Sequence, residues 1–467
     1  MPLNPTPTFA LQPSSERVAL STNYITDFDF LNQYLPDTYE KEFERYGNRS
    51  VASFLRMVGA EMPTNSDMIR WAEQGRLHSK YVSCTSAAVV GTDNGAVWTI
   101  ADADVDTGAF RIGQTLFISD NTAGSALTNR ALVTAVGVDT FTVSYYEAAG
   151  QAVAAAVSCS VFAYGSEFAK GTNGMQGSLE SEDEFFDNKP IIIKDRYAVS
   201  GSDMAQIGWV EVTTENGANG YLWYLKSEHE TRLRFEDYLE TAMIEAVPAE
   251  AGSGASTQLG GGLAGQAGSD GIFFSVGERG NVFGGGNPTT LAEFDAIIQR
   301  LDRQGSIEEN VLFVNRQFSF DIDDMLAAQN SYGAGGTSYG LFDNDEEMAL
   351  NLGFSGFRRG YDFYKTDWKY LNDPTMRGDL NAGAVNGLLV PAGSTSVYDQ
   401  VLGKNAKRPF LHVRYRASET EDRRYKTWIT GSAGGASNSD LDAMEVHFLS
   451  ERAVCTLGAN NFVLFQS

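Results

Sequence analysis

The sequence is poor in cysteine and contains no long hydrophobic run. Its three cysteines, Cys84, Cys159 and Cys455, are too few, and odd in number, for the disulfide framework of a small secreted protein. No apolar run approaches the roughly 20 residues of a membrane helix, and Met1–Ala10 has neither the basic nor the apolar region of a signal peptide. We therefore expect a protein that is made and assembled in a reducing cytoplasm, without membrane association.

Basic residues are also scarce. The chain has 35 Lys and Arg against 60 Asp and Glu, which gives a formal net charge of −25. Without clustered cations it cannot bind nucleic acid through counterion release. A container that encloses DNA without sequence-specific contacts remains possible, because like charges disfavour sticking and keep unassembled subunits soluble. A soluble acidic protein of any other kind would have the same balance.

The motifs of nucleotide-binding and hydrolytic enzymes are absent or misplaced. Gly260-x-Gly262-x-x-Gly265 has the letters of a dinucleotide fingerprint, but it follows a predicted helix rather than a strand. We therefore predict a flexible loop there. The chain has no Walker A sequence and no nucleophile elbow, and its carboxylate pairs are too numerous to nominate two for catalysis. The prediction is that the protein is not an enzyme and has no catalytic or cofactor-binding residue.

Metal sites are not predicted either. No histidine belongs to an H-E-x-x-H motif and no cysteines have zinc spacing, so helix-surface positions or strand packing are expected for all four histidines: His78, His229, His412 and His447. Three acidic clusters offer oxygens to a hard cation but lack the spacing of a calcium loop. Solvated loops or helix ends are the preferred interpretation of these clusters: Glu180–Glu184, Asp321–Asp324 and Asp343–Glu347.

The sequence does contain a β-rich segment over residues 83–162. At 467 residues the chain is long enough for two to four packed units, and we interpret this segment as a small closed barrel or sandwich inserted into a larger domain. Cys84 and Cys159 lie at its two ends, where they are either neighbours on adjacent strands or, as we prefer, separate buried thiols. The expected strands are Val97–Ile100, Ala109–Ser119, Arg130–Val136, Phe141–Tyr146 and Val153–Phe162.

The longest helical pattern covers Tyr221–Val247, about 40 Å at 1.5 Å per residue. Pro248 and a Gly-rich stretch end it. Three charge pairs at i,i+4 spacing support its exposed side: Lys226–Glu230, Glu228–Arg232 and Glu230–Arg234. The residues predicted to line its apolar side are Leu222, Leu225, His229, Leu233, Phe235, Leu239 and Met243.

The remaining patterns mix helices and strands, which predicts an α+β fold. A Gly- and acid-rich loop is expected from Gly171 to Asp187, and helices over Leu291–Leu301, with Thr290 as cap, and over Phe318–Ala328. The expected strands are Val311–Val314, Phe410–Tyr415, Tyr425–Thr430, Met444–Leu449, and then Ala453–Thr456 with Phe462–Phe465.

Several sequence strings, in combination, resemble the major capsid proteins of crAss-like phages and related podoviruses. The resemblance extends from about residue 40 to the end of the chain, and residues 83–165 do not take part. The strings that carry it are Tyr46–Val51, Ile69–His78, Leu352–Phe357, Tyr361–Lys365, Leu371–Thr375, Leu449–Val454 and Gly458–Phe462.

The resemblance implies the HK97-like major capsid fold, interrupted by the inserted β domain. It implies an N-terminal arm over 1–54 and an E-loop region over 55–82 and 163–215, which flank the insertion at 83–162. The peripheral P-domain would comprise 216–290 and 401–467, with residues 221–247 as its spine helix. The axial A-domain would comprise 291–400.

The function implied by the resemblance is that of a virion shell subunit. Such chains assemble into hexamers and pentamers of an icosahedral capsid around double-stranded DNA. The implied partners are copies of the chain itself, a portal protein, a separate scaffolding protein, and decoration or head-fibre proteins. Two alternatives stay open: a tail-tube or other virion structural protein, and a glycan-binding surface module suggested by the Gly-rich β segment.

Overall fold

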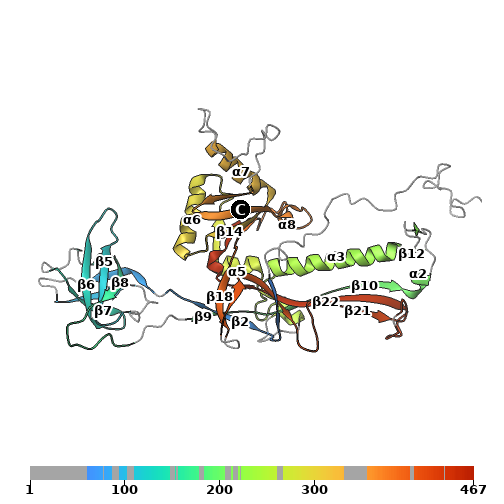
Figure 1. Cartoon of the computed structure of the whole chain (residues 1–467), viewed down its shortest axis with the longest axis horizontal. Helices are drawn as coiled ribbons and strands as arrows, with labels where there is room; N and C mark the ends of the chain where they lie inside the picture. Colours follow the sequence, from blue (N-terminus) through green and yellow to red (C-terminus); the bar gives the residue numbers. More distant parts are fainter. Residues whose placement is uncertain are drawn as a thin grey trace, which may run out of the picture. The chain divides into compact units, whose positions relative to one another are not determined.

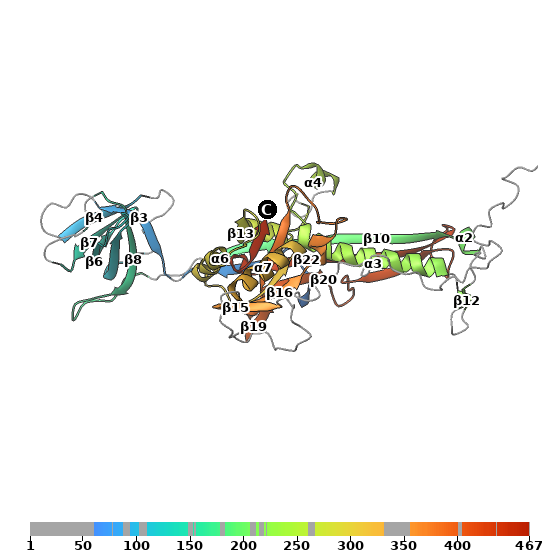
Figure 2. The same cartoon turned by 90° about the horizontal axis from the view of Figure 1, so that it is seen from above.

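The computed structural model describes residues 60–76, 78–86, 94–101, 110–147, 153, 156–177, 183–205, 212–213, 219–220, 222–259, 267–330, 355–399, 404–435 and 437–466. The chain divides into two compact units, whose helices and strands are labelled in Figures 1 and 2. The first takes its described residues from 194–238 and 427–448, and the second takes the rest. Helices and strands occur in both, as the α+β prediction requires. The predicted arm, 1–54, lies outside the described residues.

The first unit combines the N-terminal two thirds of helix α3 (Leu222–Glu245) with parts of the strands β10 (Ile191–Ser200), β21 (Lys426–Gly431) and β22 (Ala443–Thr456). Strand β22 pairs with both β10 and β21. The helix packs on these strands, because the Phe235 ring lies 5.7 Å from that of Phe448 and Arg234 Nε donates to Asp195 Oδ2 at 3.1 Å. The unit also contains the short elements α2 (Gly201–Ala205), β11 (Val212–Thr213) and β12 (Asn219–Gly220).

Helix α3 matches the predicted helix to within two residues at each end. Phe235 and Leu239 are buried, as the apolar pattern predicts, and the Leu225 side chain lies outside the described side chains. The prediction was wrong for His229, which is exposed. Residues six apart on a helix are about 120° apart around its axis, so His229 cannot share a narrow buried face with Phe235. Arg232 forms the i,i+4 ion pair with Glu236, at 3.4 Å.

The body of the second unit is a mixed sheet with strand order β13-β23-β17-β14-β16-β15. Helices α6 and α7 bury Phe294, Ile297 and Phe318 against β14, β16 and β23. The predicted cap of α6 is present: Thr290 Oγ1 accepts from Glu293 N, and the Glu293 carboxylate accepts from the Thr290 backbone. The elements of this body are α5 (Ile272–Arg279), β13 (Asn281–Gly284), α6 (Leu291–Gln304), β14 (Glu309–Val314), α7 (Arg316–Asn330), β15 (Gly356–Arg359), β16 (Tyr361–Asp367), α8 (Lys369–Asn372), β17 (Val385–Pro391), η4 (Ala459–Asn461) and β23 (Val463–Gln466).

The second unit also contains three further ladders. Strand β1 (Ala60–Thr64) runs parallel to β20 (Leu411–Arg416), and β20 runs antiparallel to the end of β22. Strand β2 (Ile69–Gln74) pairs with β9 (Asp183–Asn188), so the predicted loop over Gly171–Asp187 was wrong at its C-terminal end. The acidic composition of this stretch masked strand β9, which forms by pairing with β2. Outside these ladders lie α4 (Gly254–Gln258) and the hairpin of β18 (Ser394–Asp399) and β19 (Lys404–Pro409).

Strand β22 corrects a second prediction. The sequence suggested two strands, Met444–Leu449 and Ala453–Thr456, separated at the polar Ser450-Glu451-Arg452. The structure has one strand of 14 residues, in which all three polar residues are buried. The strand continues because these side chains are satisfied internally: Ser450 Oγ donates to the Arg424 carbonyl at 2.6 Å, and Arg452 donates to both Ser450 Oγ and that carbonyl.

The β-rich segment forms a closed barrel in the order β3-β4-β7-β6-β5-β8. Its core is apolar, with Trp98, Phe110 and Phe141 almost fully buried. The sequence expected either a barrel or a sandwich, and closure leaves no free sheet edge. Its strands are β3 (Lys80–Ser86), β4 (Asn94–Ile100), β5 (Gln114–Asp120), β6 (Thr128–Val136), β7 (Thr140–Tyr145) and β8 (Cys159–Ser166).

Two neighbouring residues of α3 provide a matched test of its buried face. Leu239 is 6% exposed and Tyr238 is 44% exposed. Leu239→Asp should cost about 3 kcal/mol or more, because it buries a charge without a partner, out of a total stability of roughly 5–15 kcal/mol. Tyr238→Asp should change stability by less than about 1 kcal/mol. Soluble yield and urea midpoints followed by circular dichroism measure both, and equal losses would contradict the assignment of the buried face.

Candidate functional site

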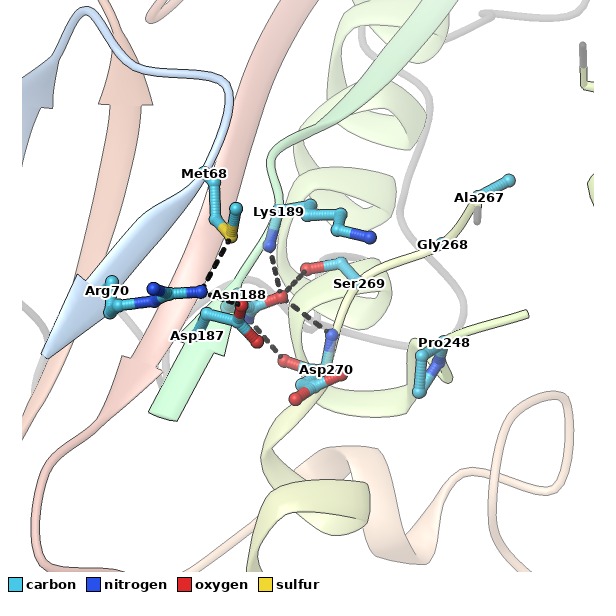
Figure 3. A pocket seen from close by; sticks show the side chains of 10 residues that line it. All are labelled: Met68, Arg70, Asp187, Asn188, Lys189, Pro248, Ala267, Gly268, Ser269 and Asp270. Carbon is cyan, nitrogen blue, oxygen red and sulfur yellow. Dashed lines mark hydrogen bonds and ion pairs between the residues drawn. The ribbon is translucent and has the colours of Figure 1, made fainter. Parts of the chain in front are cut away.

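A polar pocket of about 340 Å³ lies in the second unit (Figure 3). It is bounded by the end of β9, by Met68 and Arg70 near the start of β2, and by the loop that precedes α5. The residues that line it are Met68, Arg70, Asp187, Asn188, Lys189, Pro248, Ala267, Gly268, Ser269 and Asp270.

Asn188 organises the pocket. Its Nδ2 donates to the carbonyl oxygens of Val454, at 2.6 Å, and Asp270, at 2.9 Å. Its Oδ1 accepts from Ser269 Oγ and from the Asp270 and Lys189 backbone amides, at 2.7–2.9 Å. The side chain is 4% exposed, so these bonds form in a medium of low dielectric constant, where each is strong and costly to lose. Asn188 therefore fastens β9 to β22 and to the loop before α5.

The polar groups of the pocket mainly connect neighbouring structural elements to one another, and the pocket is called the joint below. Arg70 pairs with Asp187 at 3.4 Å, and both side chains are exposed. Burial raises the pKa of Asp270, while Arg279 opposes that rise. A general acid or base must lie within hydrogen-bond reach of the proton that it transfers, and the Asp187 carboxylate is engaged by Arg70. The pocket offers structural hydrogen bonds rather than a reactive pair.

Arg279, the last residue of α5, forms a second fastening. Its guanidinium lies 4.3 Å from the centre of the Phe186 ring and 5.5 Å from that of Trp71. Nη2 donates to Thr456 Oγ1 at 2.9 Å, and Nη1 lies 3.6 Å from Glu73 Oε1. Burial lowers the pKa of Arg279, and Glu73 is the strongest opposing influence. The β2–β9 ladder is thus clamped to α5 and β22 by a stacked arginine.

Arg452 forms a third fastening, at the β1 edge of β20 and β22. Its side chain is 8% exposed and Nη1 lies 3.6 Å from Glu61 Oε1 on β1. Burial lowers the pKa of Arg452, which Glu61 opposes. Arg424 also pairs with Glu61, and Arg423 pairs with Glu451 at 3.0 Å. Arg452 is the most buried of these arginines, whereas Arg424 is 55% exposed, so the exposed Arg424–Glu61 pair adds little stability.

The four histidines do not come together. His78 and His229 are exposed, and His412 is buried in β20 with Nδ1 3.2 Å from the Pro409 carbonyl. His447 stacks on Trp428, with ring centres 5.0 Å apart, and its Nε2 lies 2.7 Å from Thr430 Oγ1. In the part of the chain that the structure describes, no group of three or more His, Cys, Asp or Glu side chains is placed to hold a metal ion.

The acidic clusters and the Gly motif divide between described and undescribed residues. Asp323 pairs with Lys365 on β16, and Asp321 accepts from Asn287 and Gln317, so this cluster on α7 serves packing. Asp183 and Glu184 belong to β9, whereas Glu180 lies outside the described residues, as do 343–347 and 260–266. Within the described ranges, no helix combines the length and apolar character of a membrane span.

Sequence analysis missed the residues that fasten the second unit. Asn188, Arg279 and Arg452 lie in no recognisable motif, and their partners are distant in the chain: Val454 is 266 positions from Asn188, and Arg452 pairs with Glu61 near the start of the described residues. One signal was available: a charged triplet, Ser450-Glu451-Arg452, interrupts an otherwise apolar β pattern. We interpreted it as a break between strands, whereas it indicates a buried network.

Comparison with known proteins gives matches among solved structures alone. No family model matches the sequence, and no curated protein matches it. The chain is similar to a structure from Microbacterium phage Oxtober96, with 10% identity, a TM-score of 0.40, and coverage of 94% of this chain and 97% of that one. It is also similar to the capsid of a native GTA particle, with 9% identity, a TM-score of 0.37, and coverage of 94% and 97%.

A third similar structure is the mature capsid of bacteriophage PhiM1, with 10% identity, a TM-score of 0.34, and coverage of 64% of this chain and 77% of that one. TM-scores below 0.5 do not establish a shared fold. The functional assignment therefore rests on the geometry of the chain itself.

Asn188 allows a direct test of the joint. Asn188→Ala would leave several buried partners unsatisfied and should cost about 3 kcal/mol of stability. Ser269→Ala removes one of the same hydrogen bonds and should cost about 1 kcal/mol. Urea midpoints of the two variants provide the comparison. If Asn188→Ala were no worse than Ser269→Ala, the central role of Asn188 in the joint would be wrong.

Proposed function

We propose that this chain is a structural subunit of a tailed-phage capsid, with an HK97-like arrangement and an inserted β barrel. The observation that carries the proposal is the construction of the first unit. A long helix packs on a narrow sheet whose strands come from residues 194–200, 427–431 and 443–448. This is the arrangement expected of a spine helix on P-domain strands, here β21 and β22, with β10 of the proposed E-loop region paired to β22.

The contacts within that unit join the long helix firmly to its strands. Helix α3 has 24 residues, about 36 Å at 1.5 Å per residue. Arg234 ties the helix to β10 through Asp195, and Arg196 ties β10 to β22 through Glu445, each at 3.1 Å. Together with the Phe235–Phe448 contact, these two ion pairs connect the helix and the strands. A rigid spine can then pass on strain from neighbouring subunits without deforming.

The order of elements agrees with the same proposal. The proposed A-domain, 291–400, contains most of the body sheet, to which β13 and the last strand, β23, also contribute. The proposed E-loop region, 55–82 and 163–215, includes β2, β9 and β10, which flank the barrel on both sides in the chain. The P-domain segments, 216–290 and 401–467, supply α3, β21 and β22. The arm is assigned to residues 1–54 from the sequence alone.

The charges fit a container. The net charge of −25 disfavours adsorption of DNA to the shell, so the genome would be enclosed without sequence-specific contacts. The partners of such a subunit are copies of itself in hexamers and pentamers, a portal, a separate scaffold, and decoration or head-fibre proteins. Assembly would take place in the host cytoplasm and end in the virion. The crAss-like subtype is proposed from the sequence strings alone.

Electron microscopy tests the proposal. We expect the protein, co-expressed with the products of its neighbouring genes, to form closed shells in negative stain. Closed shells require pentamers among hexamers, whereas a tail-tube subunit would form open tubes. A glycan-binding module would stay as discrete particles and would be retained on immobilised glycans. Tubes, or discrete particles in every combination, would refute the capsid assignment.

The barrel should be dispensable for folding. Lys80 on β3 and Phe162 on β8 are register partners, which places their Cα atoms roughly 5 Å apart. Replacing Lys80–Phe162 by a short Gly-Ser linker should therefore leave a soluble chain with unchanged helix content, since a short linker closes the gap at little entropic cost. A matched deletion of β14, the central strand of the body sheet, should abolish soluble protein. Circular dichroism and size-exclusion chromatography distinguish the two, and insolubility of both would contradict the insertion.

A further inference from the structure

Cys84 and Cys159 face each other across one seam of the barrel. They are direct register partners in the antiparallel pair of β3 and β8. These are the first and last strands of the barrel in the chain, so their seam is where the chain enters the barrel and leaves it. Sequence analysis allowed the two cysteines to be neighbours on adjacent strands but preferred two separate buried thiols; both are buried, and the preference for separate positions was wrong, because strand pairing makes them neighbours.

Both side chains point into the barrel. Each cysteine has 0% exposure and belongs to the barrel core. The thiols are free, and they interact electrostatically, because a charge on Cys159 helps to raise the pKa of Cys84. Two thiols that share one interior, on directly opposed residues, are spaced as a cross-strand disulfide requires. Opposed residues have Cα atoms about 4.5–5.5 Å apart, and disulfides span about 4.4–6.8 Å.

The local backbone can absorb the adjustment that bonding needs. Between the pairs Tyr81↔Val161 and Cys84↔Cys159, β3 advances three residues while β8 advances two. This is a β-bulge, which bends and twists the strand locally. A bulge beside the pair permits the small approach of the two Cβ atoms without disturbing the rest of the ladder.

We propose that Cys84 and Cys159 are a redox modification site, a dithiol that a peroxide converts into a cross-strand disulfide. One thiolate attacks the O–O bond of hydrogen peroxide and becomes a sulfenic acid, with release of hydroxide. The second thiol displaces the sulfenic hydroxyl as water, and the S–S bond forms. In total, two thiols and one peroxide give one disulfide and two waters. A peroxide is small enough to reach buried sulfurs that a bulkier oxidant would not.

The disulfide would act as a lock, in the sense that it would hold the first and last strands of the barrel together. The bond would close a loop of about 75 residues, which contains the greater part of the barrel, and long loops gain the most from closure. Because β3 and β8 connect the barrel to the rest of the chain, tension between them would pass through the disulfide instead of unzipping the sheet. The inference rests on barrel geometry and does not require the capsid assignment. In a capsid, the lock would close once particles leave the reducing cytoplasm.

The pH dependence follows from burial. Burial raises the pKa of Cys84 to about 12 and that of Cys159 to about 11. Both thiols are protonated at neutral pH, and the thiolate is the species that reacts. Oxidation should therefore be slow at pH 7 and should accelerate roughly tenfold per pH unit up to pH 9, with Cys159 the first to react.

The experiment treats the full chain with hydrogen peroxide, alkylates the remaining thiols in denaturant, and maps peptides by mass spectrometry without reduction. We expect a linked peptide pair containing Cys84 and Cys159 that has lost two hydrogens, while Cys455 is alkylated. Melting of the oxidised protein should shift to higher temperature, and dithiothreitol should reverse the shift.

A register-shifted variant is the matched control. Cys84→Ser combined with Ser86→Cys keeps two barrel cysteines but moves one to a position paired with Trp98 instead of β8. Ser86 is buried and its hydroxyl has no hydrogen-bond partner, so the exchange is mild. This variant should not form the link. The proposal is overturned if Cys84 and Cys159 stay alkylatable under conditions that oxidise them in the unfolded chain, or if the shifted variant links equally well. Because shell formation is not measured in this experiment, failure of the disulfide proposal would leave the capsid assignment untouched.

Discussion

The burial of strand β22 is the constraint on which the other arrangements depend. Its first residues alternate between buried and partly exposed, whereas Leu449–Thr456 are buried throughout. A strand buried on both faces must satisfy every backbone and side-chain polar group internally. That demand brings β20, β10 and β21 to its edges. It also explains why Ser450 and Arg452 bond to the Arg424 carbonyl rather than to water.

The polar joints extend this logic to the neighbouring ladders. Asn188 bonds to the Val454 carbonyl on β22, and Arg279 bonds to Thr456 on the same strand. In each joint, buried polar groups fix the position of a strand, because a misplaced strand would leave these groups unsatisfied at a cost of about 1–3 kcal/mol each. Apolar packing alone tolerates sliding and repacking. The second unit is therefore specified by a few directional contacts set into an apolar core.

A shell subunit has a physical requirement that suits this design. The proposed role would require the subunit to keep one shape under load, and directional buried contacts provide that rigidity. The described carboxylates of the joints are engaged with cations, as Glu73 is with Arg279 and Glu61 with Arg452 and Arg424. The barrel is a separate closed core with its own seam, and the paired thiols at that seam carry the proposed redox chemistry.

The sequence by itself determined the elements with strong local patterns. The end signals of α3, the cap of α6 at Thr290 and most of the short barrel strands are properties of neighbouring residues, and these predictions agree with the structure. The predicted strands Ala109–Ser119 and Val153–Phe162 begin later, at Gln114 and Cys159, because the positive φ of Gly113 and of Ala156 interrupts the extended backbone. The tertiary structure alone decided three matters. It made β9 a strand within an acidic stretch, it joined β22 across Ser450-Glu451-Arg452, and it placed Cys84 opposite Cys159. The reason is physical: periodicity records which face of an element is buried, whereas polar partners, strand pairing and register depend on residues that are distant in the chain and become neighbours only in the fold.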